Sequence, residues 1–269
     1  MDAWPVIFLP GVVMPASAAF ANLLAELGAD VDAVTKDLEV YATSTPPSDY
    51  SLDVEVAGVL DTARVRGWDR FHLVGYSAGA AVALAFAAAH AERLGSLGLL
   101  EPAWAGNWSD ASASHRALWR EYVRVAALTP EESMPAFVRM QLQKGVEPPQ
   151  PPPGPPPPWM AQRPAGIRAI IDAFMAHDLD RDALRRFDRP VYFALGGLSN
   201  PDQFRDEAER LARVFDDFSL EVFPLRHHFD PPHRAEPSAL ATSLRRLWQR
   251  SESISGTPPE AGANRPPTE

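Results

Sequence analysis

Residues 71–79 read Phe-His-Leu-Val-Gly-Tyr-Ser-Ala-Gly, and this stretch decides the fold. Its apolar first half predicts a short buried strand, and the Ala-rich residues from 80 to about 91 predict a helix. Between them, Ser77 stands at the centre of G-Y-S-A-G, the spacing of a nucleophile elbow. Glycines two residues before and after the serine remove side chains that would collide in so tight a turn. We therefore expect Ser77 at the positive end of a helix, with the backbone N–H of Ala78 free to face a developing oxyanion.

The composition of the whole chain limits its partners and its location. The chain has 269 residues and a formal net charge of −10, so nucleic acid is not an expected partner. It has no cysteine, which excludes disulfides and thiolate metal sites. The first apolar run ends at Pro10-Gly11 and lacks a positive residue before it, so it predicts neither a signal peptide nor a membrane span. We expect a cytoplasmic globular protein without a membrane partner, and its oligomeric state stays open.

Strand and helix patterns alternate along the first hundred residues. Apolar runs predict strands at 6–9, around 34–41, at the start of 71–79 and at 94–100, with an amphipathic helix before each later strand. After an interruption, the alternation resumes with predicted strands at 190–195 and 220–224, a helix from Pro201 between them and a helix at the end. This order argues for a parallel sheet with helices on both of its faces.

The interruption lies between residues 104 and 188. It contains three helical patterns and four of the tryptophans: Trp104, Trp108, Trp119 and Trp159. A proline-rich run at 148–158 separates the second helical pattern from the third. We interpret that run as a stiff polyproline II connector, with a docking site for an SH3-like partner as the alternative.

A serine hydroxyl is a poor nucleophile without a base. Three histidines follow the last predicted strand, His227, His228 and His233, and each could supply that base. Together they could also suggest a metal site, but Pro231-Pro232 breaks the segment and no helix with a carboxylate–histidine pair accompanies them. We expect neither a metal nor an organic cofactor.

Taken together, these features resemble the α/β-hydrolase superfamily over about residues 4–250. The resemblance rests on Leu9-Pro10-Gly11, on G-Y-S-A-G at 75–79, and on His228-Phe229 followed by Pro237 at the start of the final helix. It implies an α/β fold with a mostly parallel sheet flanked by helices and a helical cap insertion.

The resemblance also implies a division of the chain. Residues 1–103 and 189–250 would form the hydrolase core, and residues 104–188 the helical cap with its proline-rich connector. Residues 251–269 are polar and rich in proline and glycine, so we expect a disordered tail there.

Two functional roles follow from the family pattern. The base of the superfamily usually precedes an aromatic residue, which selects His228 before Phe229. The oxyanion hole would use the backbone N–H groups of Ala78 and of Val12, the residue after Pro10-Gly11.

The acid that orients the imidazole departs from the usual pattern. In most of the superfamily it is an aspartate in the loop after the strand at 190–195, but here that position carries Ser199 or Asn200. Another position used in the superfamily is the end of the strand after the nucleophile helix, where Glu101 stands. We therefore expect Glu101 as the acid, with Asp202 as the alternative.

The resemblance implies an acyl-enzyme hydrolase. A serine rather than an aspartate at the elbow disfavours haloalkane dehalogenase and epoxide hydrolase chemistry. We expect hydrolysis of a carboxylic ester of a small to medium apolar acyl substrate, bound by Tyr76, Trp104 and Trp108, with Trp119 and Phe137 as further candidates. Acyl transfer, carbon–carbon bond hydrolysis and a non-catalytic module that binds a ligand or partner are the alternatives.

Overall fold

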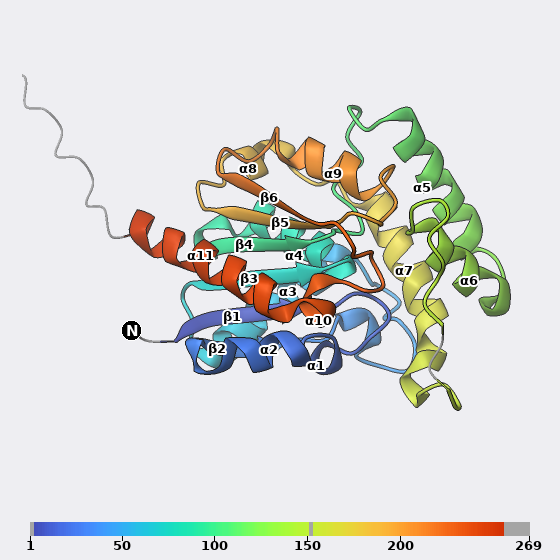
Figure 1. Ribbon diagram of the computed structural model, residues 1–269, viewed down its shortest axis with the longest axis horizontal. Coiled ribbons are helices and arrows are strands. Elements are labelled where there is room, and N and C mark those ends of the chain that lie inside the picture. The colour runs from blue at the N-terminus through green and yellow to red at the C-terminus, as the bar shows by residue number, and fades with distance from the viewer. Residues whose placement is uncertain (1–2, 151–152, 256–269) are drawn as a thin grey trace, which may run out of the picture.

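The computed structural model describes residues 3–150 and 153–255 (Figure 1). Its centre is a six-stranded sheet in the order β2-β1-β3-β4-β5-β6, in which every neighbouring pair is parallel. The strands are β1 (Trp4–Leu9), β2 (Val31–Thr35), β3 (Phe71–Tyr76), β4 (Leu94–Leu100), β5 (Val191–Gly196) and β6 (Phe218–Phe223). The predicted α/β fold is confirmed, and the parallel order brings the carboxyl ends of all strands to one edge of the sheet.

Helices cover both faces of the sheet (Figure 1). One layer consists of α1 (Ala16–Ala19), α2 (Ala21–Leu27), α10 (Pro232–Ala235) and α11 (Pro237–Ser255). The other layer consists of α3 (Leu52–Arg66), α4 (Ala78–Ala89), α8 (Arg181–Arg185) and α9 (Phe204–Leu211). Short 3₁₀ turns occur at Gly28–Asp30, Glu39–Tyr41, Ala91–Arg93 and Pro158–Gln162.

Alternation along β1 divides the hydrophobic core between these two layers. Val6 and Phe8 belong to the cluster packed by α2 and α11, whereas Ile7 and Leu9 belong to the larger cluster packed by α3 and α4. All four side chains are fully buried. Successive strand residues point to opposite faces, so an unbroken apolar run is what a strand covered on both sides requires.

The segment predicted as a cap carries α5 (Ala113–Ala126), α6 (Pro130–Met140) and α7 (Arg163–Ala176). These three, which we call the cap helices, lie together beyond the carboxyl edge of the sheet (Figure 1). The next helix, α8, packs instead against α4 on the face of the sheet. Of the proline-rich run at 148–158, residues 151–152 lie outside the described residues. No helix in the described part of the chain is both long and apolar enough to cross a membrane.

Two predicted boundaries differ from the structure. The strand expected around 34–41 is β2 at Val31–Thr35, and residues 39–41 form a 3₁₀ turn. The buried carboxylate of Glu55 accepts hydrogen bonds from the backbone N–H groups of that turn, at 2.9 and 3.0 Å, and so replaces strand pairing there. The last helix continues to Ser255, and Ser251 is buried with its hydroxyl donating to the carbonyl oxygen of Gly95 at 2.5 Å. The remainder of the predicted tail, 256–269, lies outside the described residues.

Trp248 anchors α11 to the sheet. It is fully buried, and its ring centroid lies 5.4 Å from that of Trp4 and 5.8 Å from that of His72. We expect Trp248→Ala to lower the free energy of unfolding by about 3–5 kcal/mol, because it empties a large buried volume. Urea unfolding measures the change. Val65→Ala is the control, since that side chain is 87% exposed on α3 and should matter by less than about 0.5 kcal/mol. Equal effects of the two substitutions would contradict this anchoring role.

Candidate active site

Ser77 occupies the predicted tight turn between β3 and α4. Its backbone has φ 55° and ψ −119°, a conformation that residues other than glycine rarely adopt. A Cβ atom on Gly75 would lie 2.3 Å from the carbonyl oxygen of Gly79. A Cβ atom on Gly79 would lie 2.4 Å from the carbonyl oxygen of Leu9. Both glycines are therefore required for the turn that carries Ser77.

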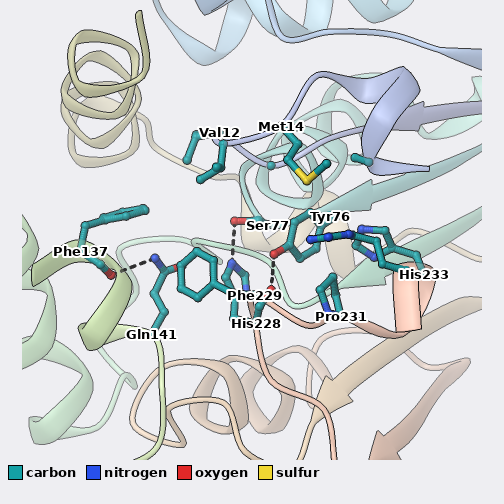
Figure 2. A pocket seen from close by; sticks show the side chains of 14 residues that line it. Val12, Met14, Tyr76, Ser77, Phe137, Gln141, His228, Phe229, Pro231 and His233 are labelled. Carbon is teal, nitrogen blue, oxygen red and sulfur yellow. Dashed lines mark hydrogen bonds between the residues drawn. The ribbon is translucent and has the colours of Figure 1, made fainter. Parts of the chain in front are cut away.

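A chain of hydrogen bonds joins Ser77 to a histidine and a carboxylate. His228, in the loop between β6 and α10, has its Nε2 3.0 Å from Oγ of Ser77 (Figure 2). Its Nδ1 lies 3.0 Å from Oε2 of Glu101. All three side chains are buried. A neutral imidazole with its proton on Nδ1 can donate to Glu101 and accept the serine proton on Nε2, which activates the hydroxyl for attack.

Aromatic side chains fix the plane of the His228 imidazole. Phe204 of α9 stacks on it with ring centroids 4.5 Å apart and an interplanar angle of 15°. Tyr76 stacks with centroids 5.0 Å apart, and its hydroxyl donates a hydrogen bond to the His228 carbonyl oxygen (Figure 2). Phe229 meets the ring edge-on at 5.4 Å. These contacts hold the imidazole in the orientation that its two hydrogen bonds require.

Glu101 stands directly after β4 and uses both carboxylate oxygens. Oε2 accepts from His228, and Oε1 accepts from the backbone N–H of Gly196 at 2.8 Å. Gly196 ends β5, the strand beside β4, so the sheet itself supplies this second donor. Glu101 has φ 46°, also in the left-handed region, which marks a second point of backbone strain beside the site.

The alternative acid, Asp202, lies outside this hydrogen-bond chain. Its side chain is exposed, and its backbone is held by two contacts. The N–H of Asp202 donates to Oδ1 of Asn200 at 3.0 Å, and its carbonyl oxygen lies 3.1 Å from Nδ1 of His115. Glu101, not Asp202, therefore contacts the imidazole of His228.

The other two histidines of the loop have different surroundings. Nδ1 of His227 accepts the backbone N–H groups of Phe229 and Asp230, both at 3.1 Å, and burial lowers its pKa. His233 is fully buried with its ring centroid 4.6 Å from that of Tyr76. Burial lowers the pKa of His233 to about 3, so it is neutral near pH 7. Of the three imidazoles, the one bonded to Ser77 belongs to His228.

Two backbone N–H groups beside Ser77 have no hydrogen-bond acceptor among the described residues, those of Val12 and Ala78. Ala78 begins α4, where the first N–H groups have no partner within the helix. Both residues line a cavity that also contains Ser77. The N–H of Gly79 donates to the carbonyl oxygen of Pro10 at 3.0 Å, which ties the loop carrying Val12 to the first turn of α4. The two free donors can therefore stabilise an oxyanion formed at Ser77.

Ser77 lies between two cavities. The first, which we call the imidazole-side cavity, has about 460 Å³ of empty space, counted together with open solvent at its mouth. It is lined by His228 and by Met14, Tyr76, Pro231 and His233 (Figure 2), and also by Arg234. The second, the cap-side cavity, has about 340 Å³ of empty space counted in the same way and is lined mainly by Trp119, Tyr122, Phe137, Ile170, Ile171 and Phe174 of the cap helices. Val12, Ser77, Phe137 and Gln141 contribute to both.

Of the three residues predicted to bind substrate, one lines a cavity at Ser77 and two do not. Tyr76 lines the imidazole-side cavity, but Trp104 and Trp108 line neither cavity. Trp104 is buried in the core, stacked on Phe174 with parallel rings 5.4 Å apart. The indole N–H of Trp108 donates to the carbonyl oxygen of Leu179 at 3.0 Å, and the guanidinium of Arg181 lies 4.8 Å from its ring centroid. Of the described residues, none form a cluster of three or more side chains suited to hold a metal ion.

Sequence patterns did not predict that α9 and Gln203, the residue before it, contribute side chains to the site around Ser77 and His228. Gln203 lines the cap-side cavity, donates to the carbonyl oxygen of Ala103 at 2.8 Å and accepts from the Tyr122 hydroxyl at 2.6 Å. Phe204 stacks on His228. The apolar periodicity of this segment indicates a helix, but the residues it meets depend on how that helix packs on the sheet.

A second buried carboxyl group, that of Glu207 on α9, lies behind the site. It is fully buried, and neither of its oxygens has a hydrogen-bond partner among the described residues. Burial raises its pKa well above the ordinary value. The positive charge of Arg210 opposes that shift, and the negative charges of Asp206 and Glu101 add to it. Burial therefore favours the protonated, neutral form of the Glu207 carboxyl group.

Comparison with known proteins agrees with this architecture. A family model described as the alpha/beta hydrolase fold matches residues 5–201. No curated protein matches the chain at a significant level.

Similar solved structures include a thermophilic esterase from Thermogutta terrifontis, with a TM-score of 0.68 and 17% identity over 93% of this chain and 91% of that one. The enol-lactonase from Burkholderia xenovorans LB400 has a TM-score of 0.66 and 14% identity over 93% and 92% of the two chains. The carboxylesterase CesB from Bacillus subtilis has a TM-score of 0.62 and 14% identity over 91% and 84%. Identities this low show a shared fold.

The neutral state of Glu207 predicts a pH-dependent stability difference. Folding raises the pKa of the Glu207 carboxyl group. Above the ordinary carboxyl pKa of about 4.3, the unfolded chain therefore releases a proton that Glu207 keeps in the native protein. The free energy of unfolding therefore falls as pH rises from that value toward the raised pKa. Glu207→Gln has no proton to lose, so we expect its stability relative to wild type to increase as the pH rises above about 4 toward the raised pKa of Glu207.

Urea unfolding at several pH values in this range measures the difference. Glu209→Gln, on the exposed side of the same helix, is the control and should differ from wild type by a constant amount. A difference for Glu207→Gln that does not change with pH would contradict the neutral state of Glu207.

Proposed function

The chain belongs to the alpha/beta hydrolase fold family, and from that premise we propose that it is a serine hydrolase that cleaves carboxylic esters through an acyl-enzyme. The observation that carries the proposal is the buried chain of two 3.0 Å contacts from Ser77 through His228 to Glu101. The esterases among proteins of similar structure are consistent with it.

In the first step, Oγ of Ser77 attacks the ester carbonyl carbon while Nε2 of His228 takes up the hydroxyl proton. The imidazolium that forms is stabilised by the Glu101 carboxylate at Nδ1. The negative charge that develops on the former carbonyl oxygen is stabilised by the N–H groups of Val12 and Ala78. These donors are part of the folded backbone, so they need no reorganisation during the reaction.

The second step indicates which cavity would hold the leaving alcohol and which the acyl group. The tetrahedral intermediate collapses, the bond to the alcohol oxygen breaks, and the imidazolium returns its proton to that oxygen. The leaving alcohol must therefore lie beside Nε2 of His228, which lines the imidazole-side cavity. The acyl group remains on Ser77 and occupies the cap-side cavity. A water molecule activated by His228 then hydrolyses the acyl-enzyme and frees the acid.

The composition of the cap-side cavity supports an apolar acyl group. Aromatic and aliphatic side chains of α5, α6 and α7 form most of its wall, and Gln141 and Gln203 are the polar side chains that accompany them beside Ser77. An apolar wall favours hydrocarbon over a charged or strongly hydrated group, because a polar group would lose its water there. We infer a small to medium apolar acyl group.

The structure does not favour the alternative of a non-catalytic module that binds a ligand or partner. Its support was the missing aspartate in the loop after β5, and Glu101 now occupies the hydrogen-bonding position at His228. Acyl transfer and carbon–carbon bond hydrolysis would use the same side chains, and no contact in the site favours either over ester hydrolysis.

Labelling of Ser77 tests the proposal directly. We expect a fluorophosphonate to form one adduct, which peptide mapping places on Ser77, and the wild-type protein to hydrolyse p-nitrophenyl butyrate. Ser77→Ala should abolish both, and His228→Ala should slow both by several orders of magnitude because the base is lost. A folded wild-type protein without adduct or turnover would refute the proposed function.

The two candidate acids are distinguished by matched amide substitutions. We expect Glu101→Gln to lower kcat/KM for p-nitrophenyl butyrate by about 10³–10⁴, since a neutral amide does not stabilise the imidazolium. Asp202→Asn should retain near-normal turnover, because that side chain is exposed and does not contact His228. Circular dichroism and thermal unfolding confirm that both variants are folded. The reverse pattern of activities would identify Asp202 as the acid.

A further inference from the structure

A second hollow lies on the solvent side of the cap helices. This outer groove has about 880 Å³ of empty space, which includes open solvent, and is bordered by α5, α7 and the loop that precedes α5. Trp108, Val123 and Met175 contribute apolar lining, and Asn107, Arg116 and Arg120 contribute polar lining. Val123 and Met175 are 45% and 47% exposed, so the groove is open to solvent.

One side chain separates the outer groove from the cap-side cavity. Among the residues that the structure describes, Trp119 of α5 is the one that lines both. Its indole is only 8% exposed and packs against Tyr122, with ring centroids 5.3 Å apart, and edge-on against Phe174 at 6.2 Å. Trp119 therefore forms the outer wall of the cavity beside Ser77.

Packing alone holds this indole in place. Its N–H is buried and has no acceptor in the described part of the chain. The two neighbouring tryptophans differ, because the N–H of Trp104 donates to Oδ1 of Asn107 and that of Trp108 to the Leu179 carbonyl oxygen, both at 3.0 Å. Replacing Trp119 with a smaller apolar residue breaks no hydrogen bond and removes an unsatisfied donor.

We propose that Trp119 is the specificity-determining residue that limits the length of the acyl chain. The inference rests on the proposed function, in which the acyl group occupies the cap-side cavity. In the wild-type protein the indole closes the far end of that cavity. A smaller side chain joins the cavity to the outer groove, where Trp108, Val123 and Met175 offer apolar surface to additional methylenes.

The test compares p-nitrophenyl acetate, butyrate and octanoate, which share one leaving group and differ only in acyl length. We expect wild type to prefer acetate or butyrate. In Trp119→Leu and Trp119→Ala, kcat/KM for octanoate relative to butyrate should rise at least tenfold, since each newly buried methylene contributes about fourfold. Trp119→Phe, which keeps an aromatic ring, should show a smaller rise. Arg120→Ala is the matched control: Arg120 is exposed on the same helix and lines the outer groove but not the cap-side cavity, so the ratio should stay at the wild-type value.

Several outcomes would overturn the proposal. One is an unchanged ratio of kcat/KM for octanoate to kcat/KM for butyrate in folded Trp119 variants that still hydrolyse acetate. The proposed function would then stand, but Trp119 would not limit the acyl chain. An equal rise for all three esters would indicate general access rather than a limit on chain length. A similar rise in Arg120→Ala would place the limit elsewhere. No turnover of any ester by folded wild type would defeat both the proposed function and this inference.

Discussion

The contact between the first turn of α4 and the end of β1 is the constraint on which the rest of the site depends. Gly79 approaches the Leu9 carbonyl so closely that no side chain fits between them, and its N–H bonds to Pro10. That approach accompanies the positive-φ turn at Ser77 and brings Val12, Ser77 and Ala78 to the wall of one cavity. The proposed nucleophile and the proposed oxyanion donors are therefore positioned by the same backbone contact.

The position of the acid has a consequence for the cap helices. Since β4 and β5 are neighbours that end at the same edge, a carboxylate after β4 can reach His228 while β5 contributes only a backbone donor to it. The loop after β5 is then available for another contact. Asn200, in that loop, donates from its side-chain amide to the carbonyl oxygen of Met140 at 2.6 Å. Its backbone N–H donates to the carbonyl oxygen of Gln141 at 3.0 Å. A polar amide at this position thus fastens the end of α6 to the core.

Local patterns in the sequence predicted the features that local physics determines. The elbow depends on residues within one turn, and the buried strands depend on unbroken apolar runs, so both were identified. Glu101 was proposed as the acid from the resemblance to the α/β-hydrolase superfamily, and the structure places its carboxylate 3.0 Å from Nδ1 of His228. Features that depend on how distant segments pack were not predicted. The stacking of Phe204 on His228 depends on how α9 packs on the sheet. The absence of Trp108 from both cavities at Ser77 depends on how its segment packs against Leu179 and Arg181.

The core carries Ser77, Glu101 and His228, whereas the cap helices form most of the cavity wall, and this separation determines which substitutions can alter the cavity alone. Ser77, Glu101 and His228 stand on the sheet and its loops, and their hydrogen bonds go to one another and to core backbone. The wall of the cap-side cavity comes mainly from helices that contribute apolar contacts and no hydrogen bond to these three residues. Substitutions of the apolar side chains of α5 and α7 that line this cavity can therefore reshape the proposed acyl site at the cost of packing energy, whereas replacing Tyr122 also removes its hydrogen bond to Gln203. The contact between Ser77 and His228 is left intact by such changes, because aromatic rings outside those helices, including Phe204 and Tyr76, hold His228 in place.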